Sequence, residues 1–317
     1  MEKDLSSLLT VHRGVTSRNL KGACFALEGL NSLATVYFFY YLYFYTKAQF
    51  QFGAMQNLLL AALLGGVYAL GSFFSGRFAQ KFGYLTAIRF GVALMMVAFL
   101  ACSQTGSMRL TMALAVAGSI GMCLTWPAME ALVSEGEPPA RLQGLVGFYN
   151  VVWAAAAGFA YFTGGAMQQK WGWQTMFYVP AGILALELGL ATWLEKKVRQ
   201  QPAEAERAAL PLLHPVTESY RSPVAPATFL KLAWVANPMA YLAINTVIAT
   251  VPSLATRMNF SRMMAGFVCS IWLFARTATF VALRVWPGWH YRFGYLASAY
   301  GAMIVGFLSS CALHLTG

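Results

Sequence analysis

Apolar runs of about 20 residues recur along nearly the whole chain, and short polar segments separate them. The hydrocarbon core of a bilayer is about 30 Å thick, so a helix needs about 20 mostly apolar residues to cross it. Nine segments come near this length, namely residues 22–45, 57–78, 84–102, 110–133, 144–167, 175–194, 229–254, 263–283 and 295–313. The pattern predicts an all-α membrane protein with about nine transmembrane helices.

The two ends of these spans differ in charge. The first 21 residues are polar and basic, without an apolar core or a small-residue cleavage site, so they predict a cytoplasmic tail (residues 1–21) rather than a removable signal peptide. With alternating spans, sixteen of the 22 lysines and arginines fall on the face that holds this tail and five on the other. This bias predicts a multi-pass protein of the plasma membrane, the inner membrane in a bacterium, with its N-terminus in the cytoplasm.

The remaining composition excludes several classes of site. The formal net charge of +11 does not indicate nucleic-acid binding, because the basic residues are spread in small groups at span ends. The five cysteines lie in or beside apolar spans without paired spacing, and the four histidines form no ligand pair. No catalytic residue, metal site or cofactor is predicted. The expected partners are the lipid bilayer, a small-molecule solute and a coupling proton or cation.

A long charged connection with five prolines, residues 195–228, divides the spans into six and three. It predicts an N-terminal six-helix bundle (22–194), a cytoplasmic central loop (195–228) and an incomplete C-terminal bundle (229–317). The tetrapeptide FGYL opens both the third and the ninth span, although chance alone yields about one such repeat in a chain of this length. Two copies six spans apart at one membrane face predict parallel repeats about an axis normal to the membrane, the second unfinished.

The stretch GRFAQKFGYL, residues 76–85, resembles the signature loop between the second and third helices of the major facilitator superfamily. Gly76, Lys81 and Gly83 match that signature, whereas Gln80 stands where the family usually has Asp, so a charged latch becomes a neutral hydrogen bond of about half the strength. Gly76, with Gly71, is expected to allow close helix approach, and Gly83 a tight turn. Lys81 alternatively only obeys the positive-inside rule.

Two further stretches are similar to the same family. QKWGWQTMFYVPAGI, residues 169–183, looks like its entry into the sixth helix, and residues 130–150 look like its turn between the fourth and fifth helices. The fourth span lacks an Arg near Val116 or Ala117, and the fifth lacks the Gly-Pro pair of many drug antiporters. The resemblance therefore implies a transporter but disfavours a proton-antiporting drug pump.

Polar residues inside the spans form stripes at helical spacing. Glu28, Asn31 and Thr35 share one face of the first span, and Asn237, Tyr241 and Asn245 share one face of the seventh. The resemblance implies that the first, fourth and seventh helices line a central cavity, while hydrogen bonding between helices is the alternative explanation. The candidate substrate-pathway residues are Glu28, Asn31, Trp126, Glu130, Asn150, Trp153, Asn237, Asn245 and Arg276.

Arg276 lies near the middle of the eighth span. A charge at this depth costs at least about 2.5–3.5 kcal/mol, so a partner or a wet cavity is expected. Either an anionic substrate or an ion pair with Glu28, Glu130 or Glu187 satisfies this expectation.

Together these patterns predict a secondary active transporter of the major facilitator type, without enzymatic chemistry, that moves a small solute by alternating access. A non-transporting membrane scaffold or remnant is the alternative, and a polytopic lipid-modifying enzyme is a weaker one because no cluster of His, Asp or Glu marks one membrane face. Since parallel repeats of six helices would need twelve, the chain is also expected to be truncated after its ninth helix and not to transport alone. Substrate, coupling ion, direction and oligomeric state stay open.

Overall fold

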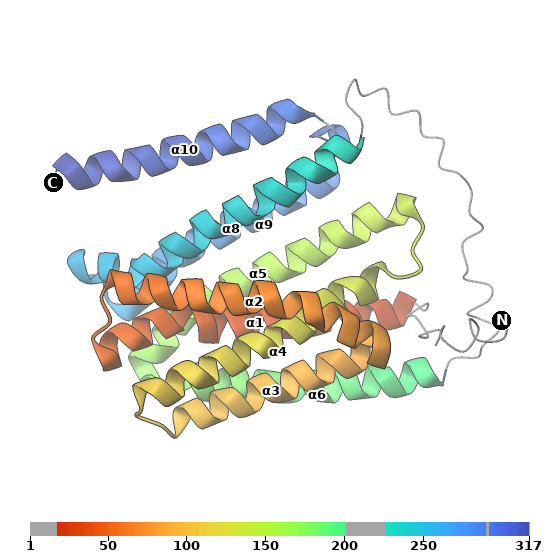
Figure 1. Ribbon diagram of the computed structural model, residues 1–317, viewed down its shortest axis with the longest axis horizontal. Helices are drawn as coiled ribbons and strands as arrows, with labels where there is room; N and C mark the ends of the chain where they lie inside the picture. The colour runs from red at the N-terminus through yellow and green to blue at the C-terminus, as the bar shows by residue number, and fades with distance from the viewer. Residues whose placement is uncertain (1–17, 201–225, 290–291, 317) are drawn as a thin grey trace.

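The computed structural model describes residues 18–200, 226–289 and 292–316, and within them the secondary structure is entirely helical. This confirms the predicted all-α class (Figure 1). The helices are α1 (Arg18–Phe50), α2 (Ala54–Phe82), α3 (Tyr84–Ser103), α4 (Met108–Ser134), α5 (Pro139–Trp171), α6 (Thr175–Arg199), α8 (Pro226–Arg257), α9 (Arg262–Val285) and α10 (Phe293–Thr316), with a short 3₁₀ turn η1 (Pro287–Trp289) before α10.

Seven of these helices are long and apolar enough to cross a membrane: α2, α3, α4, α5, α6, α8 and α9. The helix α1 is not among them, because its 33 residues include several tyrosines and the polar residues Glu28 and Asn31, which lower its hydropathy. The described apolar part of α10, Phe293–Ser309, is shorter than the others. The prediction of a multi-pass membrane protein is confirmed, and its nine segments correspond to the nine helices described.

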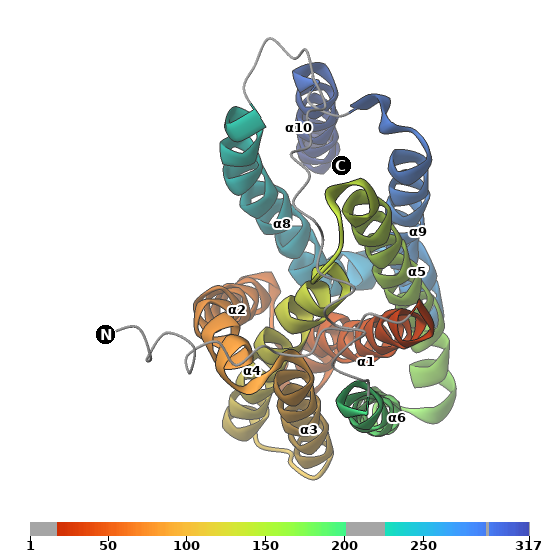
Figure 2. The ribbon, with the colours of Figure 1, turned by 90° about the vertical axis from the view of Figure 1, so that its right-hand side faces the viewer.

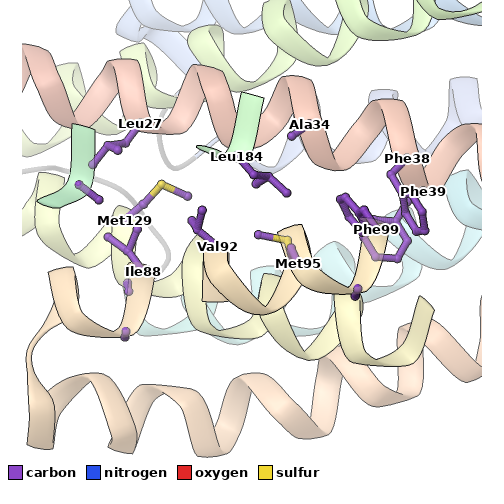
Figure 3. Close-up of a cluster of buried hydrophobic side chains, with 14 of the residues drawn as sticks. Leu27, Ala34, Phe38, Phe39, Ile88, Val92, Met95, Phe99, Met129 and Leu184 are labelled. Atoms are coloured by element: carbon purple, nitrogen blue, oxygen red, sulfur yellow. The ribbon is translucent and has the colours of Figure 1, made fainter. Parts of the chain in front are cut away.

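The first six helices form one packed unit around α1. Helix α1 packs against α4, α5 and α6, and α3 packs against α4 and α6. The core of this unit contains Leu27, Phe38, Met95, Phe99 and Leu184, all fully buried (Figure 3). The rings of Phe38 and Phe99 stack with their centroids 3.8 Å apart, so α1 and α3 are joined by aromatic packing.

Helices α8 and α9 lie on the opposite side of α1 from α3 and α6 (Figure 2). Helix α8 packs on α2 and α1, whereas α9 lies antiparallel to α5 along most of its length. Figure 1 shows that α3 and α10, the helices that begin within the two FGYL copies, run in the same direction. This direction agrees with a parallel repeat, while the domain boundaries and the repeat itself stay predictions.

The pairing of α5 with α9 depends on glycine. A Cβ atom on Gly266 would lie 2.9 Å from the carbonyl oxygen of Tyr161 and 3.2 Å from the Cα atom of Gly165. Near this crossing, the Arg262 side chain donates to the carbonyl of Gln168 at 3.1 Å. The absence of side chains at the two glycines thus lets the backbones of α5 and α9 approach closely.

Candidate substrate site

The polar stripe of α1 is buried inside the six-helix unit. Glu28 and Asn31 are 0% exposed and Thr35 is 1% exposed. The amide nitrogen of Asn31 donates to both carboxyl oxygens of Glu187 on α6, at 2.9 and 3.2 Å. Its amide oxygen accepts from the hydroxyl of Thr125 on α4 at 3.4 Å. Asn31 therefore links α1, α4 and α6. This agrees with the second explanation of the polar stripe, in which its residues form hydrogen bonds between helices.

Glu28 is a second buried carboxyl group in the same unit. One of its oxygens accepts from the Ser32 hydroxyl at 2.8 Å, and Tyr149 of α5 lies beside the group. Glu130 of α4 is within electrostatic reach of it. Among the residues that the structure describes, no ion pair includes Glu28 or Glu187.

Arg276 on α9 is half-buried and surrounded by aromatic rings. Its guanidinium carbon is 4.4 Å from the ring centre of Trp153 on α5, 5.4 Å from that of Tyr241 on α8 and 5.2 Å from that of Phe280 on its own helix. One guanidinium nitrogen donates to the Tyr241 hydroxyl at 3.3 Å. These distances are those of cation–π interactions.

The expected ion pair of Arg276 with Glu28, Glu130 or Glu187 is not present. Within residues 18–200, 226–289 and 292–316 the ion pairs join Lys21 to Glu137 and Glu195 to two arginines, Arg89 and Arg199. Glu187 instead accepts from Asn31, as described above. Aromatic faces therefore surround the cation, and of the two sequence-based explanations the ion pair is wrong, whereas contact with an anionic substrate stays a prediction.

The rings around Arg276 continue into a larger group. The rings of Trp153 and Trp126 lie 6.4 Å apart, those of Trp126 and Tyr68 5.9 Å apart, and those of Tyr40 and Trp272 6.4 Å apart. Tyr40 is also within electrostatic reach of Arg276. We call this set the aromatic cluster, and its members are Tyr40, Tyr68, Trp126, Trp153, Tyr241, Trp272 and Phe280.

The aromatic cluster contains a second N–H donor without an acceptor. The indole nitrogen of Trp126 is buried and has no hydrogen-bond partner among the described residues. A buried donor without an acceptor costs free energy, and functional sites are among the places where such donors occur. Arg276 and Trp126 thus bring available N–H groups to one region where the six-helix unit meets α8 and α9.

The other candidate residues are not members of the aromatic cluster. Glu130, Asn237 and Asn245 are exposed, and Asn150 is half-buried. Asn150 donates to the Val146 carbonyl at 2.9 Å and Asn245 to the Tyr241 carbonyl at 2.8 Å, each within its own helix. Of the nine candidate residues, the structure brings together Trp126, Trp153 and Arg276 in the aromatic cluster. Glu28 lies within electrostatic reach of Tyr68, a member of that cluster, and of Glu130, while Asn31 links helices of the six-helix unit.

Several members of the aromatic cluster are missing from the candidates chosen by sequence. Trp272 and Phe280 stand four residues before and after Arg276, so helical spacing alone places them on its face. Tyr40 and Tyr68 come from α1 and α2, where aromatic residues are common in apolar spans. No local signal distinguishes these two tyrosines from core residues.

Three of the four signature residues, Gly76, Gln80 and Lys81, lie in the last two turns of α2, and Gly83 forms the turn between α2 and α3. Gly83 has φ 97° and ψ 145° and donates to the Ala79 carbonyl at 2.8 Å, a conformation that requires glycine. Gln80 and Lys81 are exposed, and the Lys81 ammonium lies 5.3 Å from the ring centre of Phe82.

The expected close approach holds for one glycine of α2 and not for the other. A Cβ atom on Gly71 would lie 2.6 Å from the sulfur of Cys123 on α4, whereas one on Gly76 would meet nothing within 4 Å. The expectation for Gly76 is therefore wrong. Gly76 lies five residues further along α2, where α4 does not come close to it.

These features define a polytopic α-helical membrane protein with a cation and aromatic rings gathered where two groups of helices meet. The family model of the Major Facilitator Superfamily matches residues 23–317, and the chain belongs to this family. The chain is also 26% identical over 141 residues to the tetracenomycin C resistance and export protein of Streptomyces glaucescens. That match covers 44% of this chain and 26% of the relative, so it spans about a quarter of that protein's length.

Proposed function

We propose that the protein is a secondary active transporter that moves a small solute bearing an anionic group, by alternating access, across a bacterial inner membrane. The observation that carries this proposal is Arg276, held within the aromatic cluster without a carboxylate partner in the described residues. Membership of the Major Facilitator Superfamily supports transport rather than enzymatic chemistry.

The surroundings of Arg276 favour a planar, anionic solute. Aromatic rings pack around the guanidinium, and its single hydrogen bond, to Tyr241, leaves most of its N–H groups available. A guanidinium binds a carboxylate, sulfonate or phosphate through two parallel hydrogen bonds. The indole N–H of Trp126 offers a further donor, and the neighbouring rings offer apolar surface to an aromatic body.

The position of the aromatic cluster suits alternating access. Its rings come from α1, α2, α4 and α5 on one side and from α8 and α9 on the other. A solute bound there would contact both groups of helices, so a rocking motion between them would change which side of the membrane it can reach. Lys47, at the end of α1, and the basic residues at the end of α6 would then lie on opposite faces, with the N-terminus cytoplasmic.

The relative from Streptomyces glaucescens is an export protein, and this favours outward transport. The fourth span lacks the Arg and the fifth span lacks the Gly-Pro pair of many drug antiporters. That the protein is not a proton-antiporting drug pump therefore stays a prediction. The buried carboxyl group of Glu28 is the group we propose to carry a coupling proton, because it has no cation partner in the described residues.

A transport assay with a matched pair of variants tests the proposal. The purified full chain is reconstituted in proteoliposomes and supplied with aromatic carboxylates and sulfonates, and with neutral and cationic analogues of the same shape. We expect saturable binding of the anions and, if the chain transports without further helices, saturable movement as well, and each should fall at least tenfold in Arg276→Gln. Arg284→Gln removes another α9 arginine, which lies over Phe148 with its guanidinium 5.0 Å from the ring centre, and should keep wild-type transport.

Two outcomes would overturn the proposal. One is transport of neutral or cationic analogues with no preference for the anions. The other is an equal loss in the Arg276→Gln and Arg284→Gln variants, which would assign both arginines to general stability. Absence of movement with binding of the anions retained would agree with the expectation that this chain does not transport alone, whereas absence of binding as well would favour the alternative of a non-transporting scaffold.

A further inference from the structure

A shallow groove runs along the outer surface of the six-helix unit between α3 and α6. It has a volume of about 440 Å³, within the roughly 300–1,000 Å³ of small-ligand sites. Its lining is mostly apolar and includes Met96, Leu188, Gly189, Trp193 and Lys196. Figure 2 shows α3 and α6 at the edge of the molecule away from α8 and α10, so the groove is remote from the aromatic cluster.

The middle of the groove is open because it contains a glycine. Gly189 is exposed, and a Cβ atom there would meet nothing within 4 Å. Met96 of α3 and Leu188 of α6 form apolar walls beside it. A surface of this kind accepts a flexible hydrocarbon chain without requiring any polar contact.

One end of the groove carries a positive charge at the expected boundary of the membrane. From Thr175 to Lys196, helix α6 rises about 32 Å, which is close to the thickness of the hydrocarbon core. Lys196 is exposed, and Trp193 stands one turn before it, 45% exposed. Tryptophan next to lysine is the usual arrangement at a membrane–water interface, where the ammonium extends to the polar headgroups.

The neighbouring acidic residue does not neutralise this end. Glu195 pairs with Arg89 of α3 and with Arg199, so its carboxylate is already shared by two cations. In the described residues no ion pair includes Lys196. The ammonium therefore stays available to an anion at the end of an apolar groove.

We propose that the groove between α3 and α6 is a binding site for one anionic phospholipid. The headgroup phosphate pairs with Lys196, the indole of Trp193 lies at the glycerol level, and an acyl chain follows Leu188 and Gly189 along α6. Apolar lining selects a lipid over a soluble anion, and the cation selects an anionic headgroup over a zwitterionic one. The lipid site does not depend on Arg276 or on transport, so its test is independent of the proposed function.

Lipid counting by native mass spectrometry tests the proposal on the purified full chain in detergent micelles. The chain is titrated with phosphatidylglycerol and, as reference, phosphatidylcholine of the same acyl composition. We expect one phosphatidylglycerol to be retained about fivefold more tightly, the increment of one lysine near a membrane surface. Lys196→Gln should remove this preference, whereas Lys197→Gln, which changes an exposed neighbour outside the groove, should keep it.

A second pair of variants tests the apolar part. Gly189→Leu places a side chain in the groove at a position where the added Cβ atom meets nothing within 4 Å, and it should reduce retention of both lipids. Gly182→Leu changes an equally open, exposed glycine of α6 that does not line the groove, so lipid retention should stay at the wild-type level. Both replacements raise helix propensity, and circular dichroism confirms that each variant is folded.

Three results would overturn the lipid site. Equal losses in Lys196→Gln and Lys197→Gln would indicate diffuse attraction to the basic end of α6. Wild-type retention by Gly189→Leu would show that the acyl chain lies elsewhere. Displacement of phosphatidylglycerol by excess glycerol 3-phosphate would identify a site for free phosphate instead of a lipid.

Discussion

Two polar regions among the helices satisfy their polar groups in different ways. On α1, Asn31 exchanges hydrogen bonds with Glu187 and Thr125, and all three residues belong to the six-helix unit. On α9, Arg276 is surrounded by rings from α5, α8 and its own helix and makes one hydrogen bond, to Tyr241. The first region fixes the positions of three helices, whereas the second keeps donor groups available.

The difference shows that a high cost of burial does not by itself identify a ligand-binding residue. Both regions place expensive groups among apolar helices. Hydrogen bonds to protein partners offset the free-energy cost of burying Asn31, so its role is to hold helices together. Contacts with ring faces offset part of the free-energy cost of placing the Arg276 guanidinium among apolar helices. The N–H groups at the edges of the guanidinium stay available to an anion.

The largest expected effect comes from replacing Arg276 by lysine. Arg276→Lys keeps the positive charge but loses the planar fork, so affinity for an aromatic carboxylate should fall at least tenfold. Since Arg276 makes no ion pair in the described residues, the unfolding midpoint should stay close to the wild-type value. Quenching of tryptophan fluorescence by naphthoate measures the affinity, and a parallel loss of stability would remove the distinction between the two regions.

Asn31 should show the opposite result. Asn31→Leu leaves the Glu187 carboxyl group without its amide donor and should lower the free energy of unfolding by about 1 kcal/mol. Replacing Glu187 by leucine as well removes the unpaired group and should recover most of the loss. Denaturation of the single and double variants measures this coupling, and additive losses would show that the two residues do not act together.

Replacing Trp153 tests how much its ring contributes to binding at Arg276. Trp153→Phe keeps an aromatic face but a less electron-rich one, so the position of the guanidinium becomes less fixed. Affinity for the aromatic carboxylate should fall about threefold, an energy within the range of one exposed cation–π interaction. A loss as large as that of Arg276→Lys would mean that the ring, rather than the cation, contributes most of the binding.

The smallest effect is expected for the polar stripe of α8. Asn245 is exposed and donates only to the carbonyl of Tyr241 in its own helix. Asn245→Ala should therefore change the free energy of unfolding by less than about 0.5 kcal/mol. A loss comparable to that of Asn31→Leu would show that the stripes of α1 and α8 have the same structural role after all.

The sequence predicted the helices well because each span satisfies its backbone hydrogen bonds locally and is apolar over a fixed length. It also singled out Arg276 from the cost of its position alone. The partners were harder to predict, because spacing defines the face of a helix but not the helix opposite. Glu187 meets Asn31 across 156 residues, and only Phe280 and Trp272 could be placed near Arg276 from their own helix.

The same limit explains the glycines of α2. Gly71 and Gly76 look alike in sequence, yet only Gly71 faces Cys123 closely. Gly83 was easier to interpret, because a sharp turn between two helices requires a backbone conformation that the sequence itself marks with glycine. Local conformational needs are therefore readable from sequence, while contacts between distant helices are not.

The pairing of α5 with α9 has a consequence for how the protein is made. Gln168 and Arg262, which form a hydrogen bond near the glycine crossing, are 94 residues apart in the chain. At roughly 5–20 residues per second, a ribosome needs about 5–20 seconds to add that stretch. During this interval the face of α5 around Gly165 is in the membrane without α9 packed against it. Insertion factors that shelter this face until α9 is made should therefore raise the yield of correctly assembled protein.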